Sequence, residues 1–154
     1  MLKKEEIAYF NYSRNENKKF WRRIDEKPNF KNKSVLDFGC GHGALSIDIA
    51  MLGAKFVHGI DLEEKPLEFA KENLIKNYES LNEVIKFQKL DVLLSNINQK
   101  FDYVVSKDTF EHTVNLPKVL QKIYNILNVG GRAYLGFGPL YNFYNGDHGR
   151  LNMY

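Results

Sequence analysis

The sequence predicts an α/β fold with a mostly parallel, doubly wound sheet and helices on both of its faces. Five short apolar runs, rich in β-branched and aromatic residues, have the character of strands. Helical patterns separate these runs, and strands that alternate with helices favour parallel pairing through right-handed crossovers. The runs cover residues 34–38, 55–60, 84–90, 101–106 and 132–137.

The predicted helices are recognised by their apolar spacing and by the residues that begin or end them. Proline suits the first turn of a helix, and Pro66 and Pro117 each precede apolar residues at helical spacing. A further helix from residue 44 stops at Gly53, and an N-terminal helix over residues 15–26 is broken at Pro28. Whether the short connection over residues 91–99 is helical stays open.

Length and composition fit one globular domain. The chain has 154 residues, of which 44% are apolar and 27% charged, close to ordinary usage. Its single cysteine excludes an intrachain disulfide, which favours a reducing compartment. The N-terminus lacks the apolar core of a signal peptide, and no apolar run approaches the roughly 20 residues of a membrane helix. We therefore expect a soluble cytoplasmic protein with no membrane association.

Positive charge is concentrated near the N-terminus. The first 33 residues hold ten Lys and Arg against five Asp and Glu, although the whole chain carries only +3. Such an arm can indicate an acidic partner such as nucleic acid. It can equally be a solvated helix face, which we favour because glutamates are interspersed and no dense arginine cluster is present. Nucleic acid is therefore not the expected partner.

Functional residues are expected where the strands end, because parallel sheets bind ligands at their carboxyl edge. The first strand leads into Asp37-Phe38-Gly39-Cys40-Gly41-His42-Gly43. With Ala44 and the later Asp61, this loop also fits the dinucleotide fingerprint G-x-G-x-x-G/A, so an NAD-binding domain must be weighed. Asp37 argues against NAD because its carboxylate would face a pyrophosphate of like charge. S-adenosylmethionine carries an ammonium and a sulfonium, which a nearby anion favours.

The carboxylate that ends the second strand suits a ribose. Asp61 can accept hydrogen bonds from two vicinal hydroxyls, which both candidate cofactors possess. Asp is also a favoured helix N-cap, but the spacing and the position at a strand end favour the ribose role. Leu62 could then pack on the adenine.

The arrangement acidic-x-Gly-x-Gly-x-Gly at residues 37–43 resembles the first motif of the class I, Rossmann-like S-adenosylmethionine-dependent methyltransferases, and the chain is similar to their type 11-like members. The matching segments run from about residue 35 to residue 137 and include Glu111-His112 and the turn Gly130-Gly131. The resemblance implies the strand order 3-2-1-4-5. It also implies that Asp91 and Val92 read the adenine and that Ser106 lies at the methionine end.

The resemblance thus implies S-adenosylmethionine as the cofactor, methyl transfer to an oxygen or nitrogen of a small-molecule acceptor as the reaction, and no metal. Lys107 departs from the family pattern, and we expect its side chain either to turn away from the sulfonium or to meet the cofactor's carboxylate. The expected cofactor-binding residues are Asp37, Gly39, Cys40, Gly41, Gly43, Asp61, Leu62, Asp91, Val92 and Ser106.

A general base is needed if the acceptor is a hydroxyl or an ammonium. His112 is the first candidate because histidine titrates near neutrality and this one follows the fourth strand. His148 is the second candidate, in the segment Asn145-Gly146-Asp147-His148-Gly149. His42 is expected to be a spacer in the glycine loop, and His58 to be a core residue. For His112, a structural role at a helix end is the alternative.

We expect an N-terminal helical arm or lid over residues 1–33, a cofactor-binding core over residues 34–138, and an aromatic tail over residues 139–154 that could face the substrate. The family usually continues after the fifth strand into a helix and a terminal strand pair, which this sequence lacks. We therefore expect an open edge on the fifth strand, covered by self-association or by further chain. A non-catalytic relative or fragment, and an NAD-binding domain, are the alternative functions.

Overall fold

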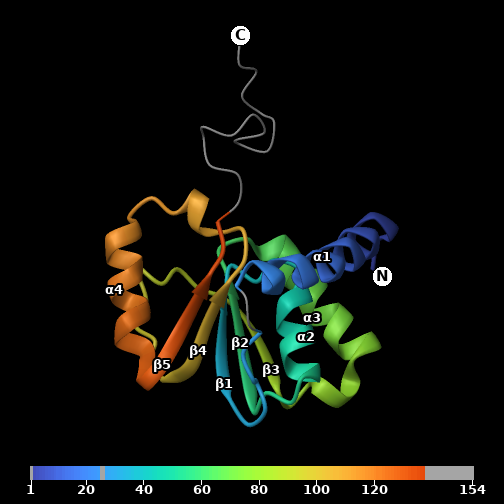
Figure 1. Cartoon of the computed structure of the whole chain (residues 1–154). Coiled ribbons are helices and arrows are strands. Elements are labelled where there is room, and N and C mark those ends of the chain that lie inside the picture. Colours follow the sequence, from blue (N-terminus) through green and yellow to red (C-terminus); the bar gives the residue numbers. More distant parts are fainter. Residues whose placement is uncertain (1, 25–26, 138–154) are drawn as a thin grey trace.

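The computed structural model describes residues 2–24 and 27–137, which form a parallel five-stranded sheet in the order β3-β2-β1-β4-β5 (Figure 1). Every neighbouring pair in this sheet is parallel. The predicted fold class and strand order are confirmed. The strands are β1 (Ser34–Phe38), β2 (Phe56–Asp61), β3 (Ile85–Lys89), β4 (Phe101–Ser106) and β5 (Leu127–Leu135).

The predicted start of the fifth strand at residue 132 is wrong, because β5 already begins at Leu127. Phe101 of β4 pairs with Leu127, whereas Tyr103 pairs with Arg132, so extra residues bulge out of β5 between these pairs. Gly130 lies in this bulge with a φ of 78°, a conformation that favours glycine. The Gly130-Gly131 turn is therefore a bulge inside the strand rather than a loop before it.

Helices cover both faces of the sheet, as predicted (Figure 1). Helices α2 (Ala44–Met51) and α3 (Glu64–Asn77) lie on one face, and α1 (Lys4–Arg23) packs against α2. Helix α4 (Leu116–Ile126) lies on the opposite face. Short 3-10 turns occur at Glu79–Leu81 and Phe110–His112. The connection over residues 91–99 forms turns and no helix.

The N-terminal helix is longer than the predicted span of residues 15–26, since α1 begins at Lys4 and ends at Arg23. Glu5 and Glu6 lie in its first turn, and Arg22 and Arg23 lie in its last. These charges interact favourably with the helix dipole at both ends. Residues 4–14 contain Ile7 and Phe10 at helical spacing, and the predicted span did not extend to them. Tertiary packing of the buried Phe10 stabilises this part of the helix.

The core has two halves because successive residues of a strand point to opposite faces. Val35 packs on the side of α1, α2 and α3, whereas Leu36 packs on the side of α4. Phe30, which follows α1, is buried between Trp21 and Tyr103 with ring centroids 5.5 and 5.8 Å away. Burying such a side chain contributes about 1.5–3 kcal/mol. This packing fixes α1 against the sheet.

Strand β5 forms one edge of the sheet. In residues 2–24 and 27–137 no strand pairs with its outer side, and Val129 and the nearby Tyr124 of α4 are exposed. The predicted open edge is therefore present in this part of the chain. Across the same residues, no helix is long and apolar enough to cross a membrane.

Candidate active site

A cleft of about 1420 Å³ lies at the carboxyl ends of the strands. The segments that follow β1, β2, β3 and β4 contribute to its lining, and one face of α1 forms a further wall. Figure 1 shows α1 at the end of the sheet toward which the strand arrows point. The topology thus brings together residues that lie up to 128 positions apart in the sequence, from Tyr9 to Phe137.

The glycine loop between β1 and α2 forms the floor of this cleft. The backbone N–H groups of Gly39 and Cys40 both donate to the carbonyl of Ile60, at 2.9 and 3.0 Å. Gly39 has a φ of 74°, and a Cβ added there would lie 2.2 Å from Thr109 Oγ1. Only glycine lets β1 turn this close to the segment that follows β4.

Asp37 is the most strongly perturbed carboxylate of the cleft. Its residue is only 1% exposed, and its Oδ2 accepts a hydrogen bond of 2.6 Å from Ser46 Oγ. Burial raises the pKa of Asp37 from 3.8 to about 6, while the Ser46 hydrogen bond and the charge of Lys107 oppose the rise. The site therefore holds a carboxylate that a cationic ligand would favour in its ionised form.

Asp61 ends β2 and orders the loops on both sides of it. Its Oδ2 accepts from the Gly41 N–H at 2.7 Å, and its Oδ1 accepts from the Glu63 N–H at 3.0 Å. Each carboxylate oxygen has two lone pairs. Asp61, which lines the cleft, can thus still accept from the two hydroxyls of a ribose.

The residues that follow β3 form the next part of the wall. Asp91, Val92 and Leu62 all line the cleft, with Leu62 exposed and Val92 buried. Asp91 Oδ1 accepts from the Leu93 N–H at 2.8 Å. This bond is local turn chemistry, and it leaves the second carboxylate oxygen available to a ligand.

Two predicted cofactor residues lie behind the cleft wall. Gly43 begins α2, and a Cβ there would lie 2.5 Å from the ring of Phe87. Ser106 is fully buried, its Oγ donates to the Phe38 carbonyl at 2.8 Å, and its own carbonyl accepts from Gly136. Neither residue is part of the lining. Both residues therefore pack behind the glycine loop, on the side away from the cleft. The Cys40 thiol is also buried, which raises its pKa well above the usual value.

Sequence reasoning missed the contribution of α1. Its lining residues recur at helical spacing and form one face of the helix. They are Tyr9, Tyr12, Ser13, Glu16, Lys19, Phe20 and Arg23. Helical spacing from residue 9 onward was the signal that could have found them, had the helix been predicted to begin at Lys4.

His42 is more than the spacer predicted within the glycine loop. Its ring lies between Tyr9 of α1 and Phe69 of α3, with centroids 4.8 and 5.1 Å away. Burial lowers the pKa of His42. It therefore connects the glycine loop with two helices, whereas His58 is buried within β2 as predicted.

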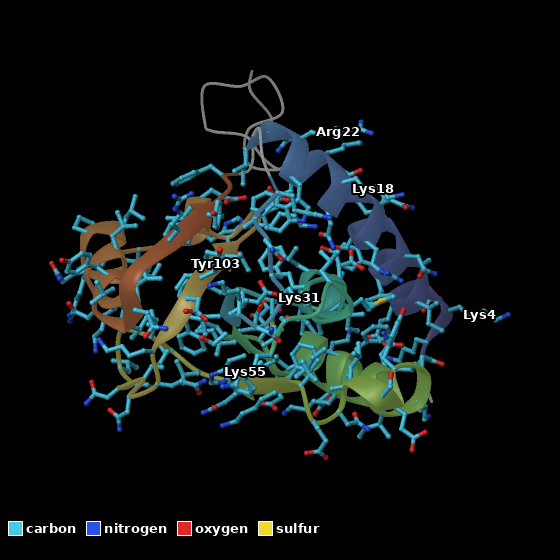
Figure 2. All side chains as sticks on the ribbon, turned by 60° about the horizontal axis from the view of Figure 1, so that its bottom comes forward. Lys4, Lys18, Arg22, Lys31, Lys55 and Tyr103 are labelled. Atoms are coloured by element: carbon cyan, nitrogen blue, oxygen red, sulfur yellow. The ribbon has the colours of Figure 1, made fainter. Side chains whose placement is uncertain are left out.

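The exposed basic residues of α1 point in two directions. Lys4, Lys18 and Arg22 lie on its outer side, away from the sheet (Figure 2), and all three are exposed. Lys19 and Arg23 instead line the cleft. The outward set is consistent with a solvated helix face.

Of the two candidate bases, His112 lies at the cleft and His148 falls outside the described residues. His112 ends the 3-10 turn after β4, is exposed, and lines the cleft. Its backbone N–H donates to the Thr109 carbonyl at 3.0 Å. No cluster of metal-ligating side chains occurs in the described part of the chain.

Comparison with known proteins identifies the class of this fold and site. Residues 29–136 match the methyltransferase domain family, so the chain belongs to it. This membership confirms the predicted family with its cofactor, S-adenosylmethionine, and decides against the NAD alternative.

Among particular relatives, a ribosomal protein L11 methyltransferase of Fusobacterium nucleatum is 48% identical over 54% of this chain and 26% of its own length. A ubiquinone biosynthesis O-methyltransferase of Dechloromonas aromatica is 35% identical over 73% of this chain and 47% of its own. A solved structure from Listeria monocytogenes, assigned as an S-adenosylmethionine-dependent methyltransferase, has a TM-score of 0.60 and 29% identity. The match covers 71% of this chain and 49% of that protein. The chain thus spans about half or less of these proteins.

Proposed function

We propose that this chain binds S-adenosylmethionine in the cleft and transfers its methyl group to an oxygen or nitrogen of a small-molecule acceptor. The observation that carries the proposal is the buried carboxylate of Asp37 at the base of a glycine loop in which Gly39 and Gly43 have no space for a side chain. A buried anion suits the cationic end of this cofactor and opposes a phosphate. A cytoplasmic location and an N-terminal lid formed by α1 are part of the proposal.

Each part of the cofactor has suitable residues in the cleft. Asp61 would accept hydrogen bonds from the ribose hydroxyls, because its two hydrogen bonds to backbone N–H groups leave further lone pairs on both carboxylate oxygens. Leu62 and Val92 would offer apolar surface to the adenine, and Asp91 a carboxylate oxygen to its amine. Asp37 would lie at the methionine end. When bound, the cofactor supplies an electrophilic methyl group on a sulfonium.

The protein's own task would be alignment and the exclusion of water. Correct orientation of two reacting groups can be worth about 7–11 kcal/mol in favourable cases. The face of α1 that lines the cleft would hold the acceptor opposite the glycine loop. His112 would remove the acceptor proton.

Ligand stabilisation tests the cofactor assignment. S-adenosylhomocysteine, at about 100 times its dissociation constant, should stabilise the fold by about 2.7 kcal/mol through mass action. NAD should have little effect, because its pyrophosphate would meet the Asp37 carboxylate. Thermal unfolding with each ligand measures the difference. A clear shift with NAD and none with S-adenosylhomocysteine would overturn the proposal.

Replacing His112 with alanine should leave the affinity for S-adenosylhomocysteine nearly unchanged and slow methyl transfer by about 10²–10⁴-fold, the usual contribution of a general base. Thr113→Ala is the matched control, because Thr113 lines the same cleft and does not accept protons near neutral pH. Single-turnover rates across pH, with an acceptor found by screening, separate the two. Equal rates in wild type and the His112 variant would remove His112 as the base.

The relatives inform the acceptor class. The match to the ubiquinone biosynthesis O-methyltransferase extends over 114 residues, against 83 for the ribosomal protein methyltransferase. The longer match favours a small-molecule acceptor. A non-catalytic or fragmentary cofactor-binding domain is the second candidate, because the chain covers 47% of the former relative and 26% of the latter. Cofactor binding without methyl transfer to any acceptor would favour this second candidate.

Self-association through the open edge of β5 is a further part of the proposal. Exposed Val129 and the outer side of the strand, which pairs with no strand in residues 2–24 and 27–137, support it, since proteins normally cover such edges. Light scattering over a range of concentrations should show a dimer or larger species, and Ala133→Lys should shift it toward the monomer. Leu94→Lys, at an exposed apolar residue elsewhere, is the control. Monomers at every concentration would contradict self-association.

A further inference from the structure

Lys107, directly after β4, is a half-buried cation on the wall of the cleft. Its Nζ donates to Asn17 Oδ1 at 2.7 Å, and to the carbonyl and hydroxyl oxygens of Ser13 at 3.1 and 3.2 Å. Every one of these partners is a neutral oxygen on α1. Among the described residues, no carboxylate forms an ion pair with it.

The position of Lys107 is fixed by a polar chain behind it. Asn17 is itself buried, and its Nδ2 donates to Asp48 Oδ2 at 2.8 Å. The other oxygen of Asp48 accepts from Arg14 Nε at 2.7 Å. This network joins α1 to α2 and holds the Asn17 amide oxygen toward Lys107. Asn17 is thus a positioning residue for the ammonium group.

A partly buried ammonium held by neutral oxygens lacks the partner that normally offsets its desolvation. Burial accordingly lowers the pKa of Lys107, although Asp108, Asp37, Glu16 and Asp48 oppose the effect from a distance. The cleft side of the ammonium is therefore a favourable place for an anion, provided that the anion belongs to a ligand.

Asp37 and Lys107 together present opposite charges at the glycine loop. Both line the cleft, and the charge of Lys107 acts on Asp37. A fixed anion beside a fixed cation is the complement of an amino-acid zwitterion, whose ammonium and carboxylate share one carbon. The methionine part of the proposed cofactor has this form.

We propose that Lys107 Nζ binds the α-carboxylate of the cofactor while Asp37 binds near its ammonium. This inference rests on the proposed function. Lys107 would release its two longer contacts with Ser13 and keep the one with Asn17. The Ser13 carbonyl would not be left unpaired, because it also accepts an N–H within α1. The site would then select adenosyl ligands that carry a carboxylate.

The other cations of the lining are less suitable. Lys19 forms an ion pair of 2.8 Å with Glu16 and is exposed. Arg23 is exposed as well. A charged hydrogen bond is strongest where water is scarce, which favours Lys107.

Two ligands separate the carboxylate from the rest of the cofactor. Decarboxylated S-adenosylhomocysteine keeps the ammonium and the adenosine and lacks only the carboxylate. Calorimetry on the full chain should show wild type binding S-adenosylhomocysteine about 10–100-fold more tightly than this analogue, the range for a charge-assisted hydrogen bond. Lys107→Met should weaken the binding of S-adenosylhomocysteine by a similar factor. It should leave the affinity for the analogue unchanged or slightly higher, because the ammonium of the analogue no longer meets a cation.

Two further variants distinguish loss of the Lys107 charge from a general structural effect of substitution. Lys107→Gln can still donate to Asn17 without a charge, and it should lose the same discrimination between ligands. Lys122→Met, which also removes contacts with a backbone carbonyl and an Asn side chain but lies on α4, should change neither affinity.

Equal weakening of both ligands by the Lys107 variants would show a merely structural role and overturn the inference. Unchanged S-adenosylhomocysteine affinity in these variants would also overturn it. In both cases the proposed function would stand, because wild type would still bind S-adenosylhomocysteine. Failure of wild type to bind S-adenosylhomocysteine would instead reject the proposed function, and this inference with it.

Discussion

Replacing Asp61 with alanine should weaken S-adenosylhomocysteine binding by at least about 100-fold while the chain still folds. Two hydrogen bonds from ribose hydroxyls to a carboxylate are worth about 1.5–3 kcal/mol each, and each 1.4 kcal/mol is a factor of ten in affinity. The substitution also releases the N–H groups of Gly41 and Glu63, which Asp61 now holds. Both effects act on the cofactor side of the cleft. Calorimetry measures the affinity and thermal unfolding measures the stability.

Asp102→Ala is the matched control for this prediction. Asp102 is also a strand carboxylate that accepts from backbone and side-chain donors, namely Ser34 and Asn128, but it does not line the cleft. It should reduce stability without changing cofactor affinity. If Asp61→Ala and Asp102→Ala have the same affinity for S-adenosylhomocysteine, the ribose assignment is wrong.

The ionisation of Asp37 should make both stability and cofactor binding depend on pH. Its pKa is about 6 in the folded chain against an ordinary 3.8, so the folded state keeps a proton that the unfolded state has lost between these values. Stability from this group therefore falls as pH rises from about 4 to about 6 and is constant above. The loss amounts to about 3 kcal/mol, because each pKa unit corresponds to 1.36 kcal/mol.

Asp37→Asn tests both parts of this expectation. The variant should be more stable than wild type at pH 7 by up to about 3 kcal/mol, with the difference vanishing near pH 4. The ammonium group of S-adenosylhomocysteine favours the ionised carboxylate, so wild type should bind this ligand more weakly below about pH 6 and release protons on binding there. The variant should bind it weakly at every pH. Denaturant unfolding and calorimetry in buffers of different ionisation enthalpy measure these quantities.

Ser46→Ala is the control for the local environment of Asp37. It removes the hydrogen bond that favours the ionised carboxylate, so the transition in binding should move to higher pH. A difference in stability between wild type and Asp37→Asn that does not change between pH 4 and pH 7 would contradict the prediction.

The sequence by itself determined the sheet, the order of its elements and the residues at the strand ends. β1 and β4 have their predicted bounds, Ser34–Phe38 and Phe101–Ser106, because the apolar pattern of a buried strand is local. Asp37, Asp61 and Asp91 all line the cleft, since a residue that ends a parallel strand must lie at the carboxyl edge of the sheet. The corrections concern the start of α1 and the bulge in β5. The helical spacing before residue 15 was present but was not used, and the turn signal of Gly130-Gly131 was overridden by the pairing of β5 with β4.

Only the tertiary structure decided which distant residues share a contact. The Asn17 amide meets the Lys107 ammonium across 90 positions of sequence, and Gly39 must be glycine because Thr109 lies against it. The tertiary structure also determines the α1 wall, the contact between the rings of His42 and Tyr9, and the position of Ser106 behind the loop. A hydrophobic period specifies which face of an element is buried. It carries no information on the partner that buries this face, because that choice depends on how all the elements pack at once.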